Sequence, residues 1–366
     1  WEGDYWQLQE NLRRQYPAAL CRPALTLVAL RRQGRAKFSQ ASRMFFDRIG
    51  LEMASGEEIA CYRAARLGVV GRVIDLCCGI GGDLIALGRH NQVWGIDTDR
   101  TRLLMASMNA EALGLSCQAG FALADARHLT PRADAVFLDP ARRSGQRRAR
   151  RGADYTPPLE LMHQLRRQVD TLIVKVSPAV ADSELAEADE LNFISAGGQC
   201  REAVLYFGPV ARGGRSAVLL PGPHTLAASP AKPEIEVAAV GAFIHDPDPA
   251  VVRAHVVEEL ALQLQAWKLS PFSAYLSGAR AQSNPFARSY EVLAHFPYNR
   301  KRLRHYLQAH DMHALEIKKR SVPLDSGTEL RRLKIRSGEI PVSLLLERLE
   351  RGVEVFICQR VHNSAD

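Results

Sequence analysis

The spacing of hydrophobic residues divides the 366-residue chain into three parts. Over residues 1–72 apolar positions recur at helical intervals, and residues 57–67 predict a helix that ends at Gly68. From residue 73 to 225, short apolar runs alternate with helical patterns, which is typical of an α/β domain. A Pro- and Ser-containing stretch then indicates a linker. Residues 235–366 mix both patterns, so we expect a C-terminal mixed α/β domain.

Short apolar runs predict the individual strands of the α/β domain. Five of them lie at 73–77, 92–97, 117–121, 135–138 and 171–176, and the last two are expected at 202–207 and 216–220. In the C-terminal domain, residues 250–267 predict one amphipathic helix, and residues 342–346 and 353–359 predict two final strands.

Residues 73–84 combine a buried strand, a glycine-rich turn and the start of a helix. The strand contains one acid, Asp75, and the turn contains Gly79 and Gly81. Glycine allows the backbone to approach a ligand that a Cβ atom would exclude, and a helix start presents free N–H groups to an anionic group. A buried carboxylate is costly unless a positive or hydrogen-bonding group meets it, and a ligand ammonium would serve.

The spacing of these glycines differs from the dinucleotide fingerprint, because Leu84 stands where that pattern needs its third glycine. The next strand ends in a second acid, Asp97, which follows Asp75 by 22 residues. An acid at the end of the second strand is placed to bind ribose hydroxyls.

This array resembles motif I of class I S-adenosylmethionine-dependent methyltransferases. The resemblance implies a Rossmann-like sheet of seven strands, with the first acid near the methionine end of the cofactor and the second on its ribose. A structural βαβ unit and a nucleotide-binding dehydrogenase are the alternatives. An acid in the loop after the third strand often contacts the adenine amino group in such enzymes, and the N-terminal helices are either a scaffold or a cover for the site. The residues expected at the cofactor are Lys37, Phe38, Asp75, Cys77, Gly79, Gly81, Asp97, Thr98, Asp125 and Ala126.

The fourth strand delivers Asp139 and Pro140 to its carboxyl end, where open α/β sheets bind ligands. The pair resembles the Asp/Asn-Pro-Pro-aromatic motif of nucleic-acid and protein-nitrogen methyltransferases, in which the acid accepts a hydrogen bond from the target amino group. Asp139 and Pro140 are therefore the predicted catalytic residues, acting chiefly by positioning the target nitrogen. Ala141 and Arg142 replace the second Pro and the aromatic residue, which leaves base stacking at that point in doubt. The alternative is a helix-capping Asp before Pro.

Six arginines fall within residues 142–151, directly after the predicted catalytic pair, and no acid interrupts them. Such a run is often only solvated surface, but beside an active site it suits contacts with a phosphate backbone. Lys175, near the end of the fifth strand, either approaches the substrate or extends from the sheet edge to solvent. The substrate contacts expected here are Arg142, Arg143, Arg147, Arg148 and Lys175.

The overall charge agrees with an acidic partner. The formal net charge is +8 and the isoelectric point is about 9.2, which favours nucleic acid only weakly. The seven cysteines show no CxxC spacing, so we expect no metal site, and scattered cysteines fit a reducing compartment. No signal peptide and no apolar run of about 18 residues is present, so we expect a cytoplasmic protein that does not span a membrane.

The order of motifs over nearly the whole chain beyond residue 35 resembles class I methyltransferases that carry a THUMP-like C-terminal domain. The resemblance rests on Lys37-Phe38, residues 50–55, 62–66, 73–83, 139–143, 246–250, 283–286 and 317–320. The Cys-Gly-x-Gly-Gly turn is also similar to the trimethylguanosine synthase group, which methylates the exocyclic N2 of guanosine. THUMP domains bind RNA, so the resemblance implies an RNA partner, either tRNA or rRNA. One departure is Ser321, where glycine is expected.

Charge in the C-terminal domain is consistent with that implication. Residues 300–336 hold eleven Lys and Arg against four Asp and Glu, which also fits a small basic packing domain. The residues expected to contact RNA there are Lys318, Lys319 and Arg320.

Three functions remain open at this stage. The first is a methyltransferase acting on an RNA base nitrogen. Transfer to pyrimidine carbon-5 usually needs a cysteine nucleophile, but no cysteine directly follows the fourth strand and Cys200 lacks a recognisable context. The second is a methyltransferase of a protein or small molecule. The third is a non-catalytic RNA-binding protein that keeps the cofactor fold. The sequence does not decide the oligomeric state.

Overall fold

The computed structural model describes residues 5–142, 151–334 and 338–361. The chain divides into two compact units, one of Trp1–Asn192 with Arg201–Gly214 and one of Phe193–Cys200 with Arg215–Asp366. The N-terminal helices thus belong to the same compact unit as most of the α/β region. The expected division of the chain into domains at 1–72, 73–225 and 235–366 stays a prediction.

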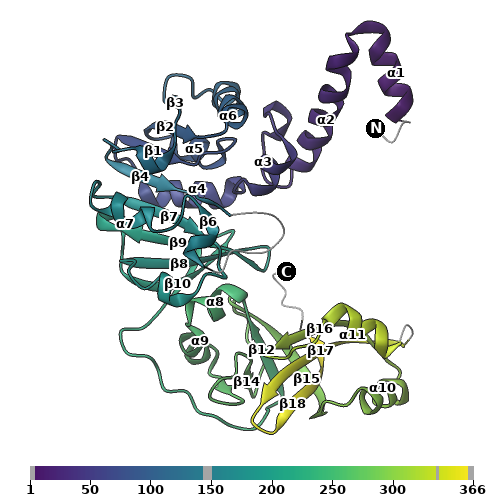
Figure 1. Cartoon of the computed structure of the whole chain (residues 1–366). Helices are drawn as coiled ribbons and strands as arrows, with labels where there is room; N and C mark the ends of the chain where they lie inside the picture. Colours follow the sequence, from purple (N-terminus) through teal and green to yellow (C-terminus); the bar gives the residue numbers. More distant parts are fainter. Residues whose placement is uncertain (1–4, 143–150, 335–337, 362–366) are drawn as a thin grey trace. The chain divides into compact units, whose positions relative to one another are not determined.

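The expected helical character of the N-terminal segment is confirmed. Helices α1 and α2 pack against each other, and α2 contacts α3 (Figure 1). Asp47 caps α3 by accepting a hydrogen bond from Gly50 N at 2.7 Å. The bounds are α1 Tyr5–Gln15, α2 Ala18–Gly34, α3 Arg48–Met53 and α4 Glu57–Leu67.

The first unit is built on a sheet whose strands follow the order β8-β9-β7-β4-β1-β2-β3. Strands β3, β2, β1, β4 and β7 run parallel, and β9 pairs antiparallel with β7. The seven strands from β8 to β3 form the expected Rossmann-like sheet. The bounds are β1 Arg72–Leu76, β2 Gln92–Asp97, β3 Ala119–Leu123, β4 Ala135–Leu138, β7 Leu172–Val176, β8 Glu190–Ala196, β9 Gln199–Phe207, β10 Gly214–Leu220 and β11 His224–Ala227.

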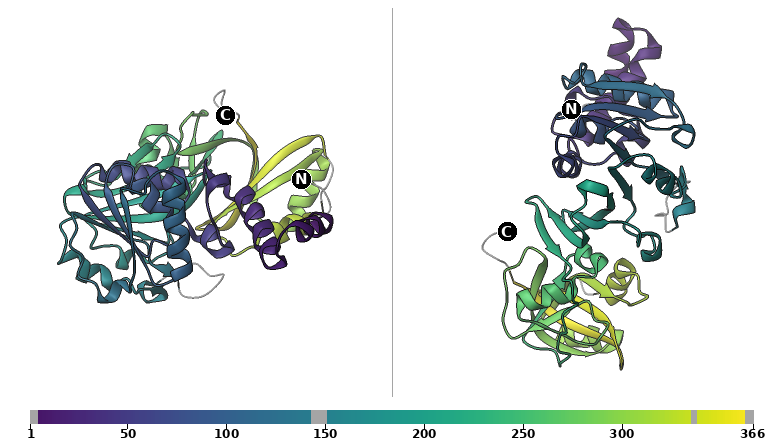
Figure 2. Two further views of the ribbon diagram at one scale, coloured as in Figure 1. Left: turned by 90° about the horizontal axis from the view of Figure 1, so that it is seen from above. Right: turned by 90° about the vertical axis from the view of Figure 1, so that its left-hand side faces the viewer.

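Helices cover this sheet and bury its central strands. Helix α4 (Glu57–Leu67) packs on α5 (Gly82–Leu87), while α5 and α6 (Arg100–Ala112) contact the strands at the β1–β3 end, and α7 (Leu161–Arg166) contacts β7 (Figures 1 and 2). All four residues of β4 are buried, as expected for a parallel strand covered on both faces.

The sequence prediction of the last two strands was wrong in detail. Strand β8 was missed, so the runs expected to close the sheet correspond to β9 and β10. The polar residues Asn192 and Ser195 lie inside β8 and interrupt its apolar pattern, although both are buried. Two short strands, β5 (Ala141–Arg142) and β6 (Tyr155–Thr156), pair with each other as a separate ribbon beyond β4.

The second unit contains a seven-stranded sheet with the order β13-β14-β12-β15-β18-β17-β16. The two predicted final strands are confirmed within β17 and β18. The single helix predicted at 250–267 is wrong, because His255 takes a left-handed conformation at φ 58° and divides it into α8 and α9. The bounds are β12 Phe243–Pro247, α8 Pro249–Ala254, α9 Val257–Leu264, β13 Trp267–Lys268, β14 Leu276–Gly278, β15 Ala287–Pro297, β16 Met312–Arg320, β17 Ile340–Leu349 and β18 Gly352–Arg360.

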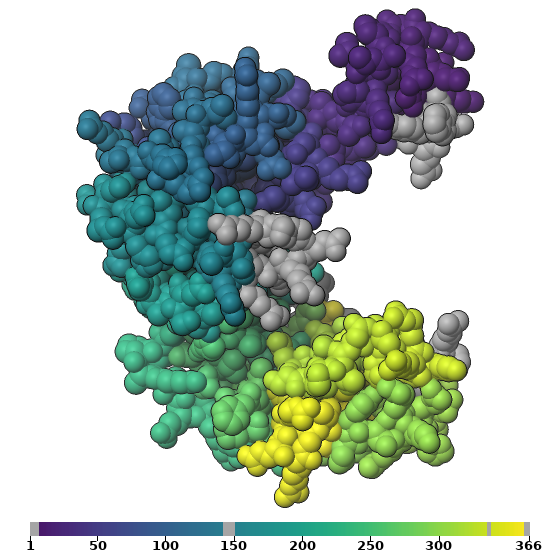
Figure 3. Space-filling view, in the orientation of Figure 1, coloured from purple at the N-terminus to yellow at the C-terminus, as the bar shows by residue number. Residues whose placement is uncertain are grey.

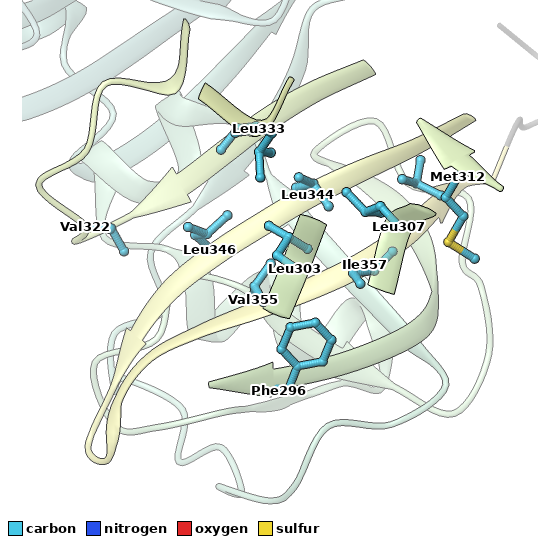
Figure 4. Close-up of a cluster of buried hydrophobic side chains, with 12 residues drawn as sticks. Phe296, Leu303, Leu307, Met312, Val322, Leu333, Leu344, Leu346, Val355 and Ile357 are labelled. Atoms are coloured by element: carbon cyan, nitrogen blue, oxygen red, sulfur yellow. The ribbon is translucent and has the colours of Figure 1, made fainter. Parts of the chain in front are cut away.

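Two further helices, α10 (Arg300–Ala309) and α11 (Ser326–Leu333), cover one face of this sheet. Their outer faces form part of the visible surface of the second unit, in yellow-green in Figure 3. Their inner leucines, Leu303 and Leu333, meet Leu344 and Leu346 of β17 in a buried cluster (Figure 4). The intervening residue, Leu345, joins a second buried cluster, so alternate residues of β17 pack on opposite faces.

Candidate active site

The predicted turn follows β1 at the centre of the first sheet, where Asp75 lies between Gly95 of β2 and Phe137 of β4. Cys77, Gly79 and Gly81 take left-handed backbone conformations with φ of 66°, 54° and 86°. The turn is tied to the end of β2, because the N–H groups of Cys77 and Cys78 donate to the Ile96 carbonyl at 2.8 and 3.1 Å.

The two predicted glycines of the turn serve different purposes. A Cβ at Gly79 would meet no described atom within 4 Å, so the missing side chain leaves open space beside the backbone. A Cβ at Gly81 would lie 3.3 Å from the Ala106 Cβ of α6, so this glycine allows the turn and the helix to pack closely. Only Gly79 therefore provides a cradle that a ligand could fill.

Asp75 has no exposed surface, and neither of its carboxylate oxygens has a hydrogen-bond partner among the described residues. Burial raises the pKa of Asp75 well above its usual range, and the nearby carboxylates of Asp83, Asp139 and Asp97 raise it further, while Lys175 opposes them. A buried acid in this state lacks a positive partner. The amino group of S-adenosylmethionine would supply one, so the unsatisfied carboxylate and the open cradle at Gly79 both fit that cofactor.

Asp97, the expected ribose ligand, is hydrogen-bonded to the turn. Its Oδ2 accepts from Gly79 N at 2.8 Å and its Oδ1 accepts from Asp99 N at 2.9 Å. These bonds fix the carboxylate beside the Gly79 cradle. Thr98 follows on the surface. The contact of Asp97 and Thr98 with a ribose stays a prediction.

Asp125, the expected adenine ligand, already has a partner. Its carboxylate accepts from the backbone N–H and the Nε of Arg127 at 2.9 and 3.1 Å, and hydrogen bonds from Arg127 lower the pKa of Asp125 to about 2. The neighbouring Ala126 is buried. An adenine amino group would have to share this carboxylate with Arg127.

Lys37 and Phe38 support the turn from the N-terminal helices. Lys37 Nζ donates to the carbonyls of Leu51, Glu52 and Ala54 at 2.8, 2.7 and 2.9 Å, which uses all three of its N–H groups at the end of α3. Burial lowers the pKa of Lys37 to about 8, and the positive charges of Lys175 and Arg201 contribute. Phe38 is buried, and its ring lies 3.6 Å from the position a Cβ would take on Gly82. The direct cofactor contacts expected of both residues stay predictions.

The predicted catalytic acid, Asp139, lies directly beyond β4 with the buried Pro140 after it. Lys175 Nζ donates to Asp139 Oδ2 at 2.6 Å. Burial raises the pKa of Asp139, and Asp83 adds to that increase, whereas Lys175 and Arg63 oppose it. Of the two positions open to Lys175 in the sequence, the structure thus places it beside the predicted catalytic acid.

A separate pocket with about 630 Å³ of empty space lies elsewhere in the first unit. It is lined by Phe38, Arg43, Cys61, Arg89 and Leu113 among others, and none of the three acids Asp75, Asp97 and Asp139 borders it. Because it lacks these groups, we do not assign the cofactor to it.

The predicted nucleic-acid contacts are only partly described. Arg142 forms part of β5, and Arg143, Arg147 and Arg148 lie outside the described residues. Lys318 and Arg320 each pair with Asp246 at 2.7 Å, and Lys319 Nζ donates to the Val322 carbonyl at 3.2 Å. Two of the resembling segments thus meet here, since 246–250 and 317–320 share an ion-pair cluster. The next residue, Ser321, takes φ 54°, which explains why glycine is expected there.

Four polar residues at the site had no role in the sequence prediction: Ser55, Arg63, Asp83 and Glu202. Arg63 pairs with both Asp83 and Glu202, and Ser55 Oγ donates to Asp83 Oδ2 at 2.9 Å. Ser55, Arg63 and Asp83 lie within the segments that carried the family resemblance, and this position was the one sign in the sequence that they could belong to the site. Their contacts span up to 139 residues of sequence, so local spacing did not reveal them.

The described parts of the chain contain no helix with the length and apolar composition needed to cross a lipid bilayer. In the same parts, no three His, Cys, Asp or Glu side chains gather in a way that would hold a metal ion.

Comparisons with known proteins identify two matching family models and a structural relative. Residues 70–178 match the family model of RNA cap guanine-N2 methyltransferases, and residues 287–360 match the model of THUMP domain-like sequences. A crystal structure of a provisionally assigned methyltransferase from Porphyromonas gingivalis W83 has the same fold, with a TM-score of 0.76 at 21% identity over 95% of this chain and 92% of that one.

Two curated proteins from strains of Mycobacterium tuberculosis, both described as uncharacterized S-adenosylmethionine-dependent methyltransferases, are each 35% identical to this chain over 348 residues. The match covers 90% of this chain and 94% of each relative. The chain therefore belongs to this family of S-adenosylmethionine-dependent methyltransferases.

Proposed function

We propose that this methyltransferase modifies a nitrogen of an RNA base, with an exocyclic amino group such as guanine N2 as the favoured target. The observation that carries the proposal is Asp139, a carboxylate at the carboxyl end of β4 with only Oδ2 bonded to Lys175. No hydrogen bond to Oδ1 is found among the described residues, so this oxygen remains for a donor from the substrate.

Each of the site residues would have a separate role in binding the cofactor or positioning the substrate. Asp75 would meet the positive charge of the cofactor, Gly79 would allow close approach, and Asp97 would hold the ribose. When bound, S-adenosylmethionine supplies a methyl group on a positively charged sulfur. Asp139 would accept a hydrogen bond from the target N–H and direct the nitrogen lone pair to that methyl, since such positioning can account for much of a rate enhancement.

One proton must leave the target nitrogen as the new N–CH₃ bond forms and the S–CH₃ bond breaks. We assign Asp139 as the acceptor because burial raises its pKa and so makes it a stronger base. Transfer to pyrimidine carbon-5 is disfavoured here, because burial raises the pKa of the Cys77 and Cys78 thiols near the site and prevents them from acting as thiolate nucleophiles.

RNA as the partner is supported by both family models and by a basic surface on the second unit. Five exposed cations lie on or beside α10 and α11: Lys301, Arg302, Arg331, Arg332 and Lys334. We call this set the α10–α11 basic face. It is a better candidate for phosphate contact than Lys318 and Arg320, which are partly buried and share the carboxylate of Asp246 as an ion-pair partner.

The decisive experiment follows labelled methyl groups from S-adenosylmethionine into bulk RNA of a strain that lacks the gene, fractionated into tRNA and rRNA, with DNA and protein alongside. We expect label in one RNA class with the wild-type chain and none with Asp139→Asn, which should still bind the cofactor within about tenfold, or roughly 1.4 kcal/mol. Label only in protein would contradict the RNA assignment. Full activity of Asp139→Asn would contradict the assignment of Asp139.

A further inference from the structure

A chain of hydrogen bonds leads from Asp139 to the N-terminal helices. Lys175 Nζ donates to Asp139 Oδ2 at 2.6 Å and to Ser55 Oγ at 2.9 Å, and Ser55 Oγ in turn donates to Asp83 Oδ2 at 2.9 Å. Lys175 is therefore held between two partners, one of which is the predicted catalytic acid. Its side chain is only 15% exposed, so solvent screens the pair weakly.

Arg63 anchors the far end of this chain of contacts. It is almost completely buried, it pairs with Asp83 and Glu202, and its guanidinium lies over the ring of Phe137, 5.4 Å from the centroid. Phe137 precedes Asp139 by two residues in β4. Arg63 therefore contacts both ends of this chain of hydrogen bonds. It pairs with Asp83, which accepts from Ser55, and it packs on Phe137 in the strand that leads to Asp139.

Stability alone is a weak explanation for such an arrangement. Buried ion pairs often contribute little net stability, because removing charged groups from water costs about as much as their attraction returns. Asp75, Asp83, Asp139 and Glu202 lie together with Arg63 and Lys175, and the positive charges of Lys37 and Lys175 also act on each other. Lys175 is the cation that directly contacts Asp139 among the described residues.

We propose that Lys175 is a positioning residue for methyl transfer: it holds Asp139 Oδ2, keeps the carboxylate ionised, and leaves Oδ1 directed to the target amino group. Ser55 and Asp83 fix Lys175 in this position, and Arg63 fixes Asp83. The inference rests on the proposed role of Asp139. It also gives a common purpose to residues 50–55 and 62–66, which the sequence singled out without a role.

The electrostatic surroundings of Asp139 determine the sign of the effect. Just beyond the end of β4, its partly buried carboxyl faces Lys175 from β7, Asp83 from α5, Arg63 from α4 and Asp75 from β1. Removal of Lys175 deletes the strongest opposing charge and leaves two acids against one arginine. The carboxyl then releases its proton at higher pH, so the acidic limb of the transfer rate moves upward.

The test compares Lys175→Met, which keeps the length of the side chain, with Lys175→Arg, which restores the charge. Single-turnover transfer to the RNA class labelled by the wild-type chain is measured from pH 5 to 9. We expect Lys175→Met to lower the rate near neutral pH roughly tenfold and to move the acidic limb up by about one pH unit. Lys175→Arg should restore most of the rate and return the acidic limb close to its wild-type position. Lys232→Met, a substitution of an exposed lysine, should change neither the rate nor the acidic limb.

A second measurement needs no substrate and separates this inference from the proposed function. The carboxyl of Asp139 is titrated by ¹³C NMR, with Asp139→Asn to assign its signal, in the wild-type and Lys175→Met chains. If no RNA is methylated by the wild-type chain, the proposed function fails, while a raised pKa of Asp139 in Lys175→Met still supports the role of Lys175.

Two results would overturn the inference. One is an Asp139 pKa that does not change in Lys175→Met. The other is a loss of rate that is independent of pH and equal in the Met and Arg variants, as a purely structural role predicts. If Lys175→Met does not fold, Ser55→Ala replaces it, and a shift of the acidic limb in the same direction but of smaller size is required.

Discussion

We expect the buried carboxylate of Asp75 to lower the stability of the cofactor-free protein but to strengthen cofactor binding. Its carboxylate is fully buried without a hydrogen-bond partner among the described residues, at the centre of a sheet. The folded chain holds it more easily in the protonated state, since its pKa is raised by burial and by three neighbouring acids. A positive ligand group would reverse that preference.

The first prediction concerns Asp75→Asn in the absence of cofactor. A raised folded pKa means that the stabilising contribution of Asp75 is full below the unfolded value of about 3.9 and is lost as pH rises toward the folded value. The neutral amide avoids that loss. We therefore expect the variant to be more stable than the wild-type chain at pH 8, by about 1–3 kcal/mol, with a difference that shrinks as pH approaches 4.

Urea unfolding at pH 5 and pH 8 measures this difference, and calorimetry measures cofactor affinity in parallel. We expect S-adenosylmethionine to bind Asp75→Asn at least roughly tenfold more weakly. A variant that loses stability equally at both pH values, or that binds the cofactor normally, would show that Asp75 is satisfied by the protein itself.

The second prediction separates the two turn glycines. Gly79→Ala places a methyl group in open space, so we expect a loss of stability of about 1 kcal/mol from the left-handed backbone alone, together with a marked loss of cofactor affinity. Gly81→Ala must also accommodate the Ala106 Cβ at 3.3 Å, so we expect the larger loss of stability, about 2–3 kcal/mol. Thermal unfolding and cofactor titration of both variants check this; the reverse order of stabilities would contradict it.

At the scale of elements, the sequence correctly predicted those helices and strands whose formation depends on residues close together in the chain. The strand, turn and helix around Asp75 follow from one short stretch, and β17 and β18 follow from their apolar alternation. Strand β8 was missed because Asn192 and Ser195 are buried polar residues whose tertiary partners override local pattern. The break at His255 was missed because nothing in a run of apolar helical positions marks a left-handed residue.

The third prediction concerns the link between β12 and β16. Asp246 pairs with Lys318 and Arg320, all three partly or fully buried. Asp246→Ala leaves two cations without their partner, so we expect the free energy of unfolding to fall by about 3 kcal/mol. Denaturant unfolding measures this, and the more exposed ion pair Lys232–Glu258, broken by Lys232→Met, serves as the matched control with an expected loss below about 1 kcal/mol.

RNA affinity of the folded Asp246→Ala chain distinguishes the two roles of this cluster. Release of Lys318 and Arg320 from Asp246 should strengthen RNA binding if they contact phosphate directly, as the sequence hypothesis holds. Unchanged affinity would assign them to the fold and leave phosphate contact to other cations.

At the scale of the whole molecule, the fourth prediction tests the α10–α11 basic face. We expect the triple variant Lys301→Gln, Arg331→Gln, Arg332→Gln to fold normally, because all three side chains are exposed. Each lost phosphate contact lowers the slope of log affinity against log salt by about 0.9 for a duplex and about 0.7 for a single strand, so three lost contacts should lower it by about 2–3. Fluorescence titrations of RNA between 50 and 200 mM salt check this; an unchanged slope would place the phosphate contacts elsewhere.

The whole site was less predictable from sequence than its parts. Asp75, Gly79, Asp97 and Asp139 could be proposed because each lies in or directly after a recognisable strand. The partnership of Lys175 with Asp139 was one of two options, and the support from Arg63 was not foreseen, since its contacts with Asp83 and Glu202 join segments far apart in the chain. Side-chain partners at that range depend on how the sheet orders its strands.

Four aspartates gather around one turn, and their effect extends to the spent cofactor. Transfer of the methyl group converts a positively charged sulfur into a neutral thioether, so the by-product S-adenosylhomocysteine carries one positive charge fewer into the same carboxylate-rich surroundings of Asp75, Asp83, Asp97 and Asp139. The attraction that favours the loaded cofactor weakens once the reaction has occurred. Product inhibition should therefore be mild, and turnover faster than in a neutral cleft of the same shape.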